Sequence, residues 1–269
     1  MINSTGNNEQ LLIIKIGGNV IDNKDALRSF LKDFSQVKGK KILVHGGGKI
    51  ATSIGEKLGI QSKYVEGRRI TDNETIDLVT MVYGGLVNKR LVALLQSLNC
   101  NAIGVSGADA NLLPAKKRPV KNIDFGWVGN IDAAGLDPEK WKLFLDNEMV
   151  PVVAPLTHDG AGFMLNTNAD TIASVLSESL SESYDVKLIY CFEKDGVLAD
   201  VNDENSVVKS LTANAYQRLK KNNQLFAGIL PKIDNAFNAV NNGVGEVVIG
   251  NSSKLSSLIS GSGGTKISL

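Results

Sequence analysis

The sequence is poor in the side chains that most often bind metal ions, and this narrows the functions it can have. It contains two cysteines and two histidines in 269 residues. Cys100 and Cys191 lie in or beside apolar stretches, so we expect both to be free, buried and inert, as in a reducing cytosol. His45 and His158 are too isolated to form a metal site, and the sequence therefore predicts no metal bound by the protein itself.

Large net charge and long apolar runs are also lacking. The formal net charge is +1, with 21% charged and 43% hydrophobic residues, which is ordinary for a soluble globular protein and gives no sign of nucleic-acid binding. No window approaches the roughly 18 apolar residues needed to cross a bilayer, and residues 1–10 lack the pattern of a signal peptide. We therefore expect a cytoplasmic protein with neither nucleic acid nor membrane as a partner.

Repeats, low-complexity tracts and long linkers are absent, and short apolar runs alternate with helical stretches instead. The apolar runs at 11–16 and 41–45 each end in glycines. Short apolar runs bounded by turn residues are typical of strands buried on both faces of a parallel sheet. The sequence thus predicts an α/β protein, as one large domain or two lobes. Further strands are expected at 101–105, 150–155, 186–191, 244–249 and 264–268.

Lys15, Gly17 and Gly18, at the end of the first expected strand, predict half of a phosphate-binding site. A buried lysine is costly unless it faces an anion, and paired glycines leave backbone N–H groups open to a phosphate. For this motif alone, a solvated lysine beside a glycine turn is an equally good interpretation. Glycines 46–48 follow the second strand, however, and ligands of such sheets bind beyond the carboxyl ends of the strands. The two glycine clusters are therefore expected to meet in one site.

Polar residues at the start of two later helices predict further parts of this site. Asn166, Asn168 and Asp170 precede an apolar stretch. One of them is expected to cap the helix, and all three together suggest a cluster that orients a ligand and positions lysines. Lys232 follows Pro231 at the start of another helix, where a lysine is unfavourable unless an anion lies nearby.

The stretch from residue 67 to about 98 combines two arginines with a long helix. Arg68 and Arg69 are expected in a loop, either solvated or, for one of them, bound to a carboxylate. Residues 71–74 form a Ser/Thr-x-x-Glu capping box. The helix that follows, to about residue 98, could equally well pack within the protein as a central spine or form a contact between subunits.

Two common nucleotide motifs give a poorer account of these residues than phosphoryl transfer does. The Walker pattern fails because Ile50 follows Lys49. Residues 46–51 meet the dinucleotide pattern, with Glu66 at roughly the expected distance, so a nicotinamide-dependent oxidoreductase is an alternative. That pattern leaves the lysines and the other glycines without a role. Phosphoryl transfer depends on positioning and electrostatic stabilisation and would use all of them.

The motifs together resemble the acetylglutamate kinases of the amino acid kinase family. They are IIKIGG at 13–18, VHGGG at 44–48, EGRRIT at 66–71, LNTNADTIA at 165–173, GILPKID at 228–234 and GGTKI at 263–267. The resemblance implies an open, mainly parallel sheet sandwiched between helices. It also implies a lobe at 1–170 that binds the acylated amino acid and forms a homodimer contact, and a lobe at 171–269 that binds ATP.

The reaction implied by the resemblance is the ATP-dependent phosphorylation of the γ-carboxylate of N-acetyl-L-glutamate to N-acetylglutamyl 5-phosphate, in arginine biosynthesis, with Mg²⁺ carried by the nucleotide. The resemblance also implies roles for single residues, transferred by motif. Lys15 and Lys232 would contact the nucleotide and the transition state, and Asp170 would orient both lysines. Gly17 and Gly18 would bind the β- and γ-phosphates, Gly47 and Gly48 would contact the substrate and the phosphoryl group, and Arg69 and Asn166 would bind the substrate. A carboxylate acceptor is already ionised at neutral pH, so no general base is needed. His45 is therefore interpreted as structural.

The sequence departs from the resemblance at the nucleotide side, where Phe192 and Glu193 replace a Thr/Ser–Asp pair; Glu193 keeps a carboxylate for nucleotide binding. An N-succinyl substrate would need an extra cation, which Lys116, Lys117 or Arg118 in an expected hairpin would supply. Arginine-inhibited relatives carry a longer N-terminal helix that joins dimers into hexamers. About ten polar residues precede the first strand here, so we expect a dimer that arginine does not inhibit.

Two other functions compete with this one: a different kinase of the same fold, and a non-catalytic sensor of nucleotide or amino acid. Arg69 and Asn166 favour an amino-acid derivative over other acceptors. The presence of both lysines together with Asp170 favours catalysis over sensing.

Overall fold

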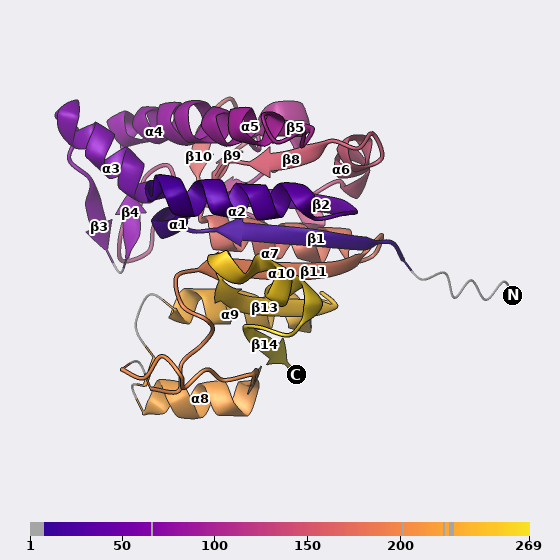
Figure 1. Ribbon diagram of the computed structural model, residues 1–269. Helices are drawn as coiled ribbons and strands as arrows, with labels where there is room; N and C mark the ends of the chain where they lie inside the picture. The colour runs from indigo at the N-terminus through magenta and orange to yellow at the C-terminus, as the bar shows by residue number, and fades with distance from the viewer. Residues whose placement is uncertain (1–7, 66, 201, 223, 226–228) are drawn as a thin grey trace, which may run out of the picture.

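The computed structural model describes residues 8–65, 67–200, 202–222, 224–225 and 229–269 (Figure 1). Glu66 of the dinucleotide pattern and Gly228 of the GILPKID motif lie outside the described residues.

An eight-stranded sheet in the order β12-β14-β13-β11-β1-β2-β8-β5 forms the centre of the molecule. Every neighbouring pair is parallel except β13 and β14. The strands are β1 (Gln10–Ile16), β2 (Lys40–His45), β5 (Ala102–Val105), β8 (Val150–Val153), β11 (Asp185–Phe192), β12 (Ser210–Thr212), β13 (Glu246–Asn251) and β14 (Thr265–Ser268). The prediction of a mainly parallel α/β sheet is confirmed.

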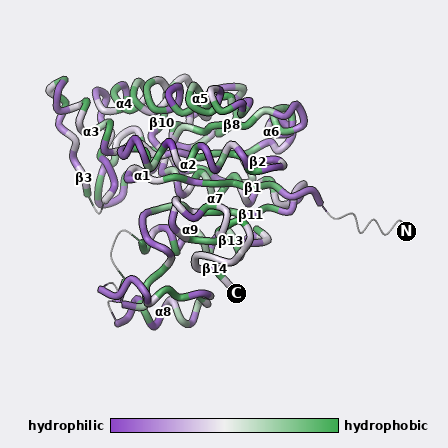
Figure 2. The backbone as a smooth tube through the Cα atoms, viewed as in Figure 1, coloured by the Kyte–Doolittle hydropathy of each residue, from purple (hydrophilic) through white to green (hydrophobic). Residues whose placement is uncertain are grey.

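Helices cover both faces of this sheet, which explains why its central strands are mostly apolar and buried along nearly their whole length (Figure 2). Along β1, Leu11 and Ile13 pack into one core cluster and Leu12, Ile14 and Ile16 into the other. The first cluster lies under α6 (Pro138–Leu145), α7 (Ala169–Leu180), α8 (Ala213–Lys221) and α9 (Leu230–Asn241). The second lies under α1 (Gly18–Asp22), α2 (Lys24–Gln36), α4 (Asn73–Val79), α5 (Asn88–Gln96) and α10 (Leu255–Ser260), with α3 (Gly48–Lys57) beside them.

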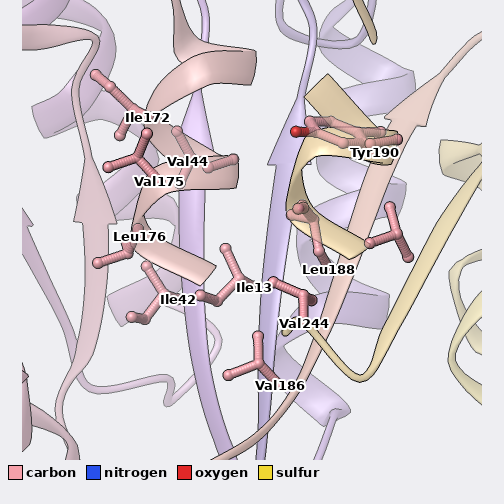
Figure 3. Packing of buried hydrophobic residues seen from close by; sticks show 14 of the residues in the cluster. Ile13, Ile42, Val44, Ile172, Val175, Leu176, Val186, Leu188, Tyr190 and Val244 are labelled. Carbon is pink, nitrogen blue, oxygen red and sulfur yellow. The ribbon is translucent and has the colours of Figure 1, made fainter. Parts of the chain in front are cut away.

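The helix α7 packs directly on the centre of the sheet. Its Ile172 and Leu176 lie against Ile13 of β1 and against Ile42 and Val44 of β2 (Figure 3). This contact matters for function because α7 begins at the carboxyl edge of β1, so burying its apolar face fixes the position of its first turn. The expected division of the chain at 170/171 falls within α7 and stays a prediction.

The long helix after residue 72 differs from the prediction in two ways. Asp72, not Thr71, caps it, because the Asp72 side chain accepts a hydrogen bond from the Thr75 N–H at 2.9 Å; the predicted capping box is therefore wrong. Between α4 and α5 the helix continues as an eight-residue π-helix, η1 (Thr80–Val87).

The helix Asn73–Gln96 is also long and apolar enough, by length and composition, to cross a membrane, which the sequence analysis did not expect. Core helices pass the same test, and Val82 and Leu91 of this helix are buried in the second core cluster.

Three small antiparallel pairs flank the sheet. They are β3 (Lys63–Val65) with β4 (Arg68–Ile70), β6 (Lys116–Lys117) with β7 (Gly129–Asn130), and β9 (Leu156–His158) with β10 (Met164–Asn166). The hairpin expected around the basic triplet is confirmed, whereas the loop expected for Arg68 and Arg69 is a strand. Short 3₁₀ turns occur at η2 (Asp109–Asn111), η3 (Ala133–Gly135) and η4 (Ser252–Lys254).

Candidate active site

The two glycine clusters meet at the carboxyl edge of the sheet, as predicted. Because β1 and β2 are parallel with Ile16 opposite His45, the glycines that follow them lie side by side. The Gly46 N–H donates to the Ile16 carbonyl at 3.1 Å. A methyl group added at Gly46 would lie 3.6 Å from the Gly18 nitrogen, so the two loops are in near contact.

Backbone N–H groups of both loops point to a shared anion site. The helix α1 begins at Gly18 and α3 begins at Gly48, so each loop presents the positive end of a helix. Among the described residues, no group accepts a hydrogen bond from the backbone N–H of Gly17, Gly18, Gly47 or Gly48. Free N–H groups at helix starts are suited to phosphate oxygens.

A buried carboxylate lies between two lysines next to these loops. The Lys15 Nζ is 2.6 Å from one Asp170 oxygen, and the Lys232 Nζ is 3.4 Å from the other. Lys15 and Asp170 are almost completely buried, and Lys232 is the more exposed lysine. These three residues come from β1, α7 and α9, so the fold assembles the predicted cluster from distant parts of the sequence.

The cluster carries more positive than negative charge in a largely buried site. Burial works to raise the pKa of Asp170, but the two lysines together hold that pKa below its usual value. Burial also lowers the pKa of Lys15, while Asp170 opposes this change. One carboxylate cannot neutralise two ammonium groups, so the arrangement favours an added anion beside it.

Asp170 is fixed through the start of α7. Asn168 caps this helix, and its side chain accepts hydrogen bonds from the Asp170 and Thr171 N–H groups at 2.8 and 3.1 Å. The Tyr190 hydroxyl donates to the Asp170 carbonyl at 3.0 Å. Asn168 therefore acts as the expected cap, and the carboxylate in the first turn faces the lysines.

Arg69 lies at the other end of the glycine loop. Its guanidinium donates to the Gly48 carbonyl at 2.8 Å and to the Thr52 hydroxyl at 2.9 Å, and it also contacts Ser62. Arg69 is 7% exposed, yet none of its described partners carries a negative charge. A buried guanidinium with neutral partners is suited to binding a carboxylate of a ligand.

Asn166 joins this region from β10. Its side-chain nitrogen donates to the Thr71 hydroxyl at 3.0 Å, and its backbone N–H donates to the Trp127 carbonyl at 2.9 Å. Thr71 follows Arg69 in the chain by two residues, so the predicted substrate residues lie on neighbouring segments.

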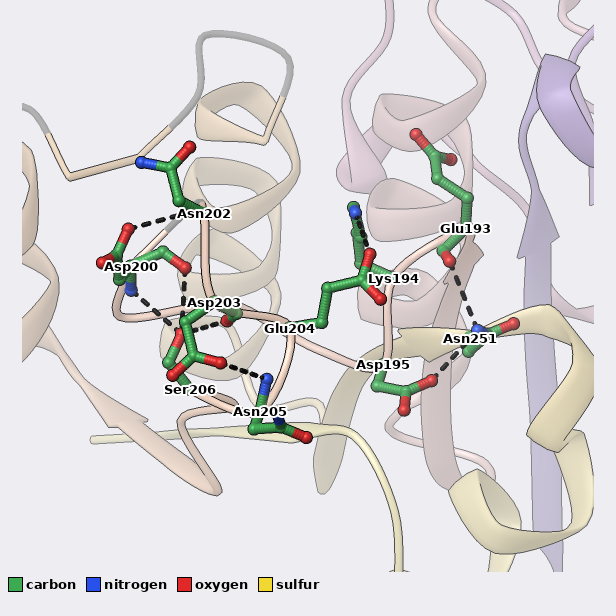
Figure 4. A network of polar contacts seen from close by, with 10 residues as sticks. All are labelled: Glu193, Lys194, Asp195, Asp200, Asn202, Asp203, Glu204, Asn205, Ser206 and Asn251. Carbon is green, nitrogen blue, oxygen red and sulfur yellow. Dashed lines mark hydrogen bonds and ion pairs between the residues drawn. The ribbon is translucent and has the colours of Figure 1, made fainter.

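The loop after β11 lies at the same edge of the sheet as the glycine loops, because β11 is parallel to β1 with Cys191 opposite Ile16. The Asn251 side chain donates to the Glu193 carbonyl at 3.3 Å and to Asp195 at 3.0 Å (Figure 4). Lys254 pairs with Asp195 at 2.6 Å. The Glu193 side chain is exposed and has no described polar partner, so its nucleotide role stays a prediction.

The structure also shows residues that the sequence analysis missed. Asn88 binds the ring of His45, Tyr83 packs against Gly47, and Thr52 holds Arg69. The sequence signal for Asn88 is weak, because Lys89 and Arg90 follow it directly and give the pattern of a solvated helix face.

His45 is structural, as interpreted, and its burial predicts a pH dependence of stability. The ring is fully buried, and burial lowers its pKa to about 4 from an unfolded value near 6.5. Below the unfolded pKa the unfolded chain takes up a proton that the folded chain does not, so stability falls as the pH decreases from about 6.5 towards 4.

We expect the free energy of unfolding to drop by about 2 kcal/mol from this residue between roughly pH 7 and pH 5. Urea unfolding at both pH values measures the drop, which His45→Asn should reduce. An equal drop in the His45→Asn protein would contradict this assignment.

Comparison with known proteins identifies relatives over nearly the whole chain. The profile of the amino acid kinase family matches residues 10–251. The acetylglutamate kinase of Cytophaga hutchinsonii is 54% identical over 252 residues, covering 93% of this chain and 95% of that protein. The acetylglutamate kinase of Bacteroides fragilis is 49% identical over 259 residues, covering 96% and 97%.

Among solved structures, N-acetylglutamate synthase from Neisseria gonorrhoeae, in complex with coenzyme A and N-acetylglutamate, superposes with a TM-score of 0.80 at 23% identity. The alignment covers 96% of this chain and 59% of that longer chain. This likeness shows the fold alone.

Proposed function

Because the chain belongs to the amino acid kinase family, we propose that it is an ATP-dependent acetylglutamate kinase of arginine biosynthesis. It transfers the γ-phosphoryl group of ATP to the γ-carboxylate of N-acetyl-L-glutamate and releases ADP and N-acetylglutamyl 5-phosphate. The observation that carries this proposal is the Lys15–Asp170–Lys232 cluster, which lies beside two glycine loops with free N–H groups.

The residues present fit a bound nucleoside triphosphate. Two ammonium groups, one carboxylate and free backbone N–H groups give a donor set suited to phosphates. ATP supplies the phosphoryl group, and Mg²⁺ is proposed to arrive on its phosphates. Gly17 and Gly18 hold the β- and γ-phosphates through their N–H groups, and Glu193 is proposed to contact the nucleotide.

Catalysis in this proposal rests on charge and positioning. Lys15 and Lys232 neutralise the charge that develops on the oxygens around the transferring phosphorus, and Asp170 keeps both ammonium groups directed at it. The N–H groups of Gly47 and Gly48 meet the phosphoryl group and the acceptor. No proton has to be removed, because the attacking carboxylate is ionised at neutral pH.

Arg69 and Asn166 are proposed to bind the amino-acid part of the substrate. Replacing Arg69 with alanine is expected to raise the KM for N-acetylglutamate about 10- to 100-fold, since charge-assisted hydrogen bonds contribute about 1.5–3 kcal/mol. The KM for ATP should change little. Arg68, which is exposed on the same strand, gives the control variant Arg68→Ala. Equal KM values for the two variants would contradict the role of Arg69.

The wider organisation is also proposed on the basis of the family. Residues 1–170 would bind the acylated amino acid and form the contact of a homodimer, and residues 171–269 would bind ATP. We propose a cytoplasmic location, in keeping with the biosynthetic role, and no inhibition by arginine.

One observation favours N-succinylglutamate as a second candidate substrate. The guanidinium of Arg118 donates to Asn130 at 2.9 Å, and burial, together with the nearby charge of Arg68, lowers the pKa of Arg118. The hairpin that carries Arg118 bridges to Asn166 through Val128. A second carboxylate on the acyl group would find a cationic surface there.

The two substrates are separated by their kcat/KM values. We expect N-acetylglutamate to be preferred and Arg118→Ala to change its kcat/KM less than about twofold, as for a group outside the reacting site. If N-succinylglutamate is instead preferred, and Arg118→Ala lowers its kcat/KM about tenfold or more, the second candidate replaces the first. Lys121→Ala, at an exposed position in the loop of the same hairpin, is the matched control.

A further inference from the structure

Three buried side chains hold the loop of residues 46–48 from behind, and the proposed mechanism gives none of them a task. His45, Tyr83 and Asn88 are 0%, 5% and 1% exposed. All three contact the loop or one another, so they form a support between the loop and the helix above it.

The hydrogen bonds of His45 define its tautomer. Its Nδ1 lies 2.7 Å from the Gly46 carbonyl oxygen, and its Nε2 lies 3.1 Å from the side-chain nitrogen of Asn88. An amide nitrogen can only donate, so Nε2 accepts and Nδ1 carries the proton that is donated to Gly46. Asn88 therefore selects the tautomer that ties down the loop.

Asn88 is itself held in a fixed orientation. Its side-chain nitrogen donates its second proton to the Val152 carbonyl at 2.8 Å, on the neighbouring strand β8. Turning the amide around would place its oxygen against that carbonyl, which is unfavourable because both atoms only accept. The Asn88 oxygen has no hydrogen-bond partner among the described residues.

Tyr83 supports the next residue of the loop by contact. A methyl group added at Gly47 would lie 3.0 and 3.2 Å from two carbons of the Tyr83 ring. The ring thus fills the space behind Gly47 and leaves the loop no room to move back.

The π-helix η1 places Tyr83 and Asn88 on the same side. In an α-helix, residues five apart lie about 140° from one another. Here the Asn88 N–H donates to the Tyr83 carbonyl, an i→i+5 bond, as well as to Gly85. Such π-helical turns are rare and occur often at functional sites.

We propose that Asn88, through His45, and Tyr83 are positioning residues that hold the Gly46–Gly48 loop where its N–H groups meet the transferring phosphoryl group. This inference rests on the proposed function for the reaction but on the described contacts for the positioning. A loop that shifts by about 1 Å loses alignment with the transition state, which typically costs on the order of 100-fold in rate.

The test compares steady-state kinetics of paired variants with ATP, Mg²⁺ and N-acetylglutamate. Asn88→Ala is expected to lower kcat about 10- to 100-fold while the KM for ATP stays within about twofold. Gln96→Ala is the matched control, because Gln96 on the same helix donates to the Ala102 carbonyl at 2.9 Å without approaching the loop. Its kcat should stay within about twofold of the wild type.

Two further sets of variants test the proposal if the Asn88→Ala protein does not fold. Tyr83→Ala should lower kcat about tenfold, whereas Tyr83→Phe, which keeps the ring against Gly47, should restore it. His45→Asn places an amide nitrogen where Nδ1 was and removes the partner of Asn88. Adding Asn88→Ala to His45→Asn should therefore cost no further activity, because the two act through one hydrogen bond.

An unchanged kcat in Asn88→Ala, equal losses in Tyr83→Ala and Tyr83→Phe, or additive losses in the double variant would overturn the proposal. NMR of the backbone amides distinguishes a failure of the positioning role from a failure of the proposed reaction. If the wild type does not turn over N-acetylglutamate, the Gly47 and Gly48 signals should still shift in Asn88→Ala and stay in place in Gln96→Ala. Unshifted signals would overturn the positioning role by themselves.

Discussion

Replacing Lys15 with methionine is expected to lower kcat about 1,000-fold, since removing one preorganised donor from a transition state costs about 100- to 1,000-fold and here a full charge is lost as well. Lys15 is 5% exposed and 2.6 Å from Asp170, so water cannot take over its role. The KM for N-acetylglutamate should change much less, because the interaction strengthens in the transition state.

A buried lysine on the neighbouring strand provides the control for Lys15. Lys41 is also 5% exposed, but its ammonium donates to the Phe34, Ser35 and Val37 carbonyls, at the end of α2. Lys41→Met should therefore lower the melting temperature and leave kcat close to that of the wild type. If both variants lose activity equally, the loss in Lys15→Met reflects damage to the fold and the catalytic assignment is wrong.

Replacing Asp170 with asparagine is expected to lower kcat about 100-fold or more, because the amide no longer holds two ammonium groups in place. In the native protein Asp170 works to raise the pKa of Lys15 against the lowering effect of burial. Without the carboxylate the pKa of Lys15 falls further. Since catalysis needs the protonated lysine, activity should be lost at a lower pH than in the wild type as the pH rises.

The measurement for Asp170 is the pH profile of kcat. Its control is Glu246→Gln, because Glu246 also lies near two lysines, Lys187 at 3.3 Å and Lys266 at 3.9 Å, far along the sheet from the glycine loops. This control should keep the wild-type profile. An Asp170→Asn enzyme with an unshifted alkaline limb would show that Asp170 does not govern the charge of Lys15.

Many of the candidate site residues could be predicted because they occur in short sequence motifs. Lys15, Gly17 and Gly18 follow an apolar run, and Asp170 follows two asparagines before an apolar helix. Since parallel strands place their carboxyl ends at one edge, the first glycine pair could be expected to meet glycines 46–48 without knowledge of distances.

The rest depended on contacts between distant segments, which local patterns do not contain. The Thr71 hydroxyl accepts a hydrogen bond from the Asn166 side chain instead of capping a helix. A tertiary hydrogen bond therefore replaces the capping interaction that the local sequence predicts. The π-helical turn before Asn88 also depends on distant contacts, because the Asn88 side chain bonds to His45 and to the Val152 carbonyl on other strands. The strand that carries Arg69 pairs with β3 a few residues earlier, but the Arg69 side chain is held by Gly48 and Thr52 of α3.

An acyl phosphate made at the Lys15–Asp170–Lys232 cluster reacts with hydroxylamine to give a hydroxamate. The most direct measurement is therefore trapping of the product with hydroxylamine, in the presence of ATP, Mg²⁺ and N-acetyl-L-glutamate. The wild type should form the hydroxamate in step with ADP, and the Lys232→Ala enzyme should form it at least about 100-fold more slowly. ADP release without hydroxamate, or equal hydroxamate formation by both enzymes, would contradict the account.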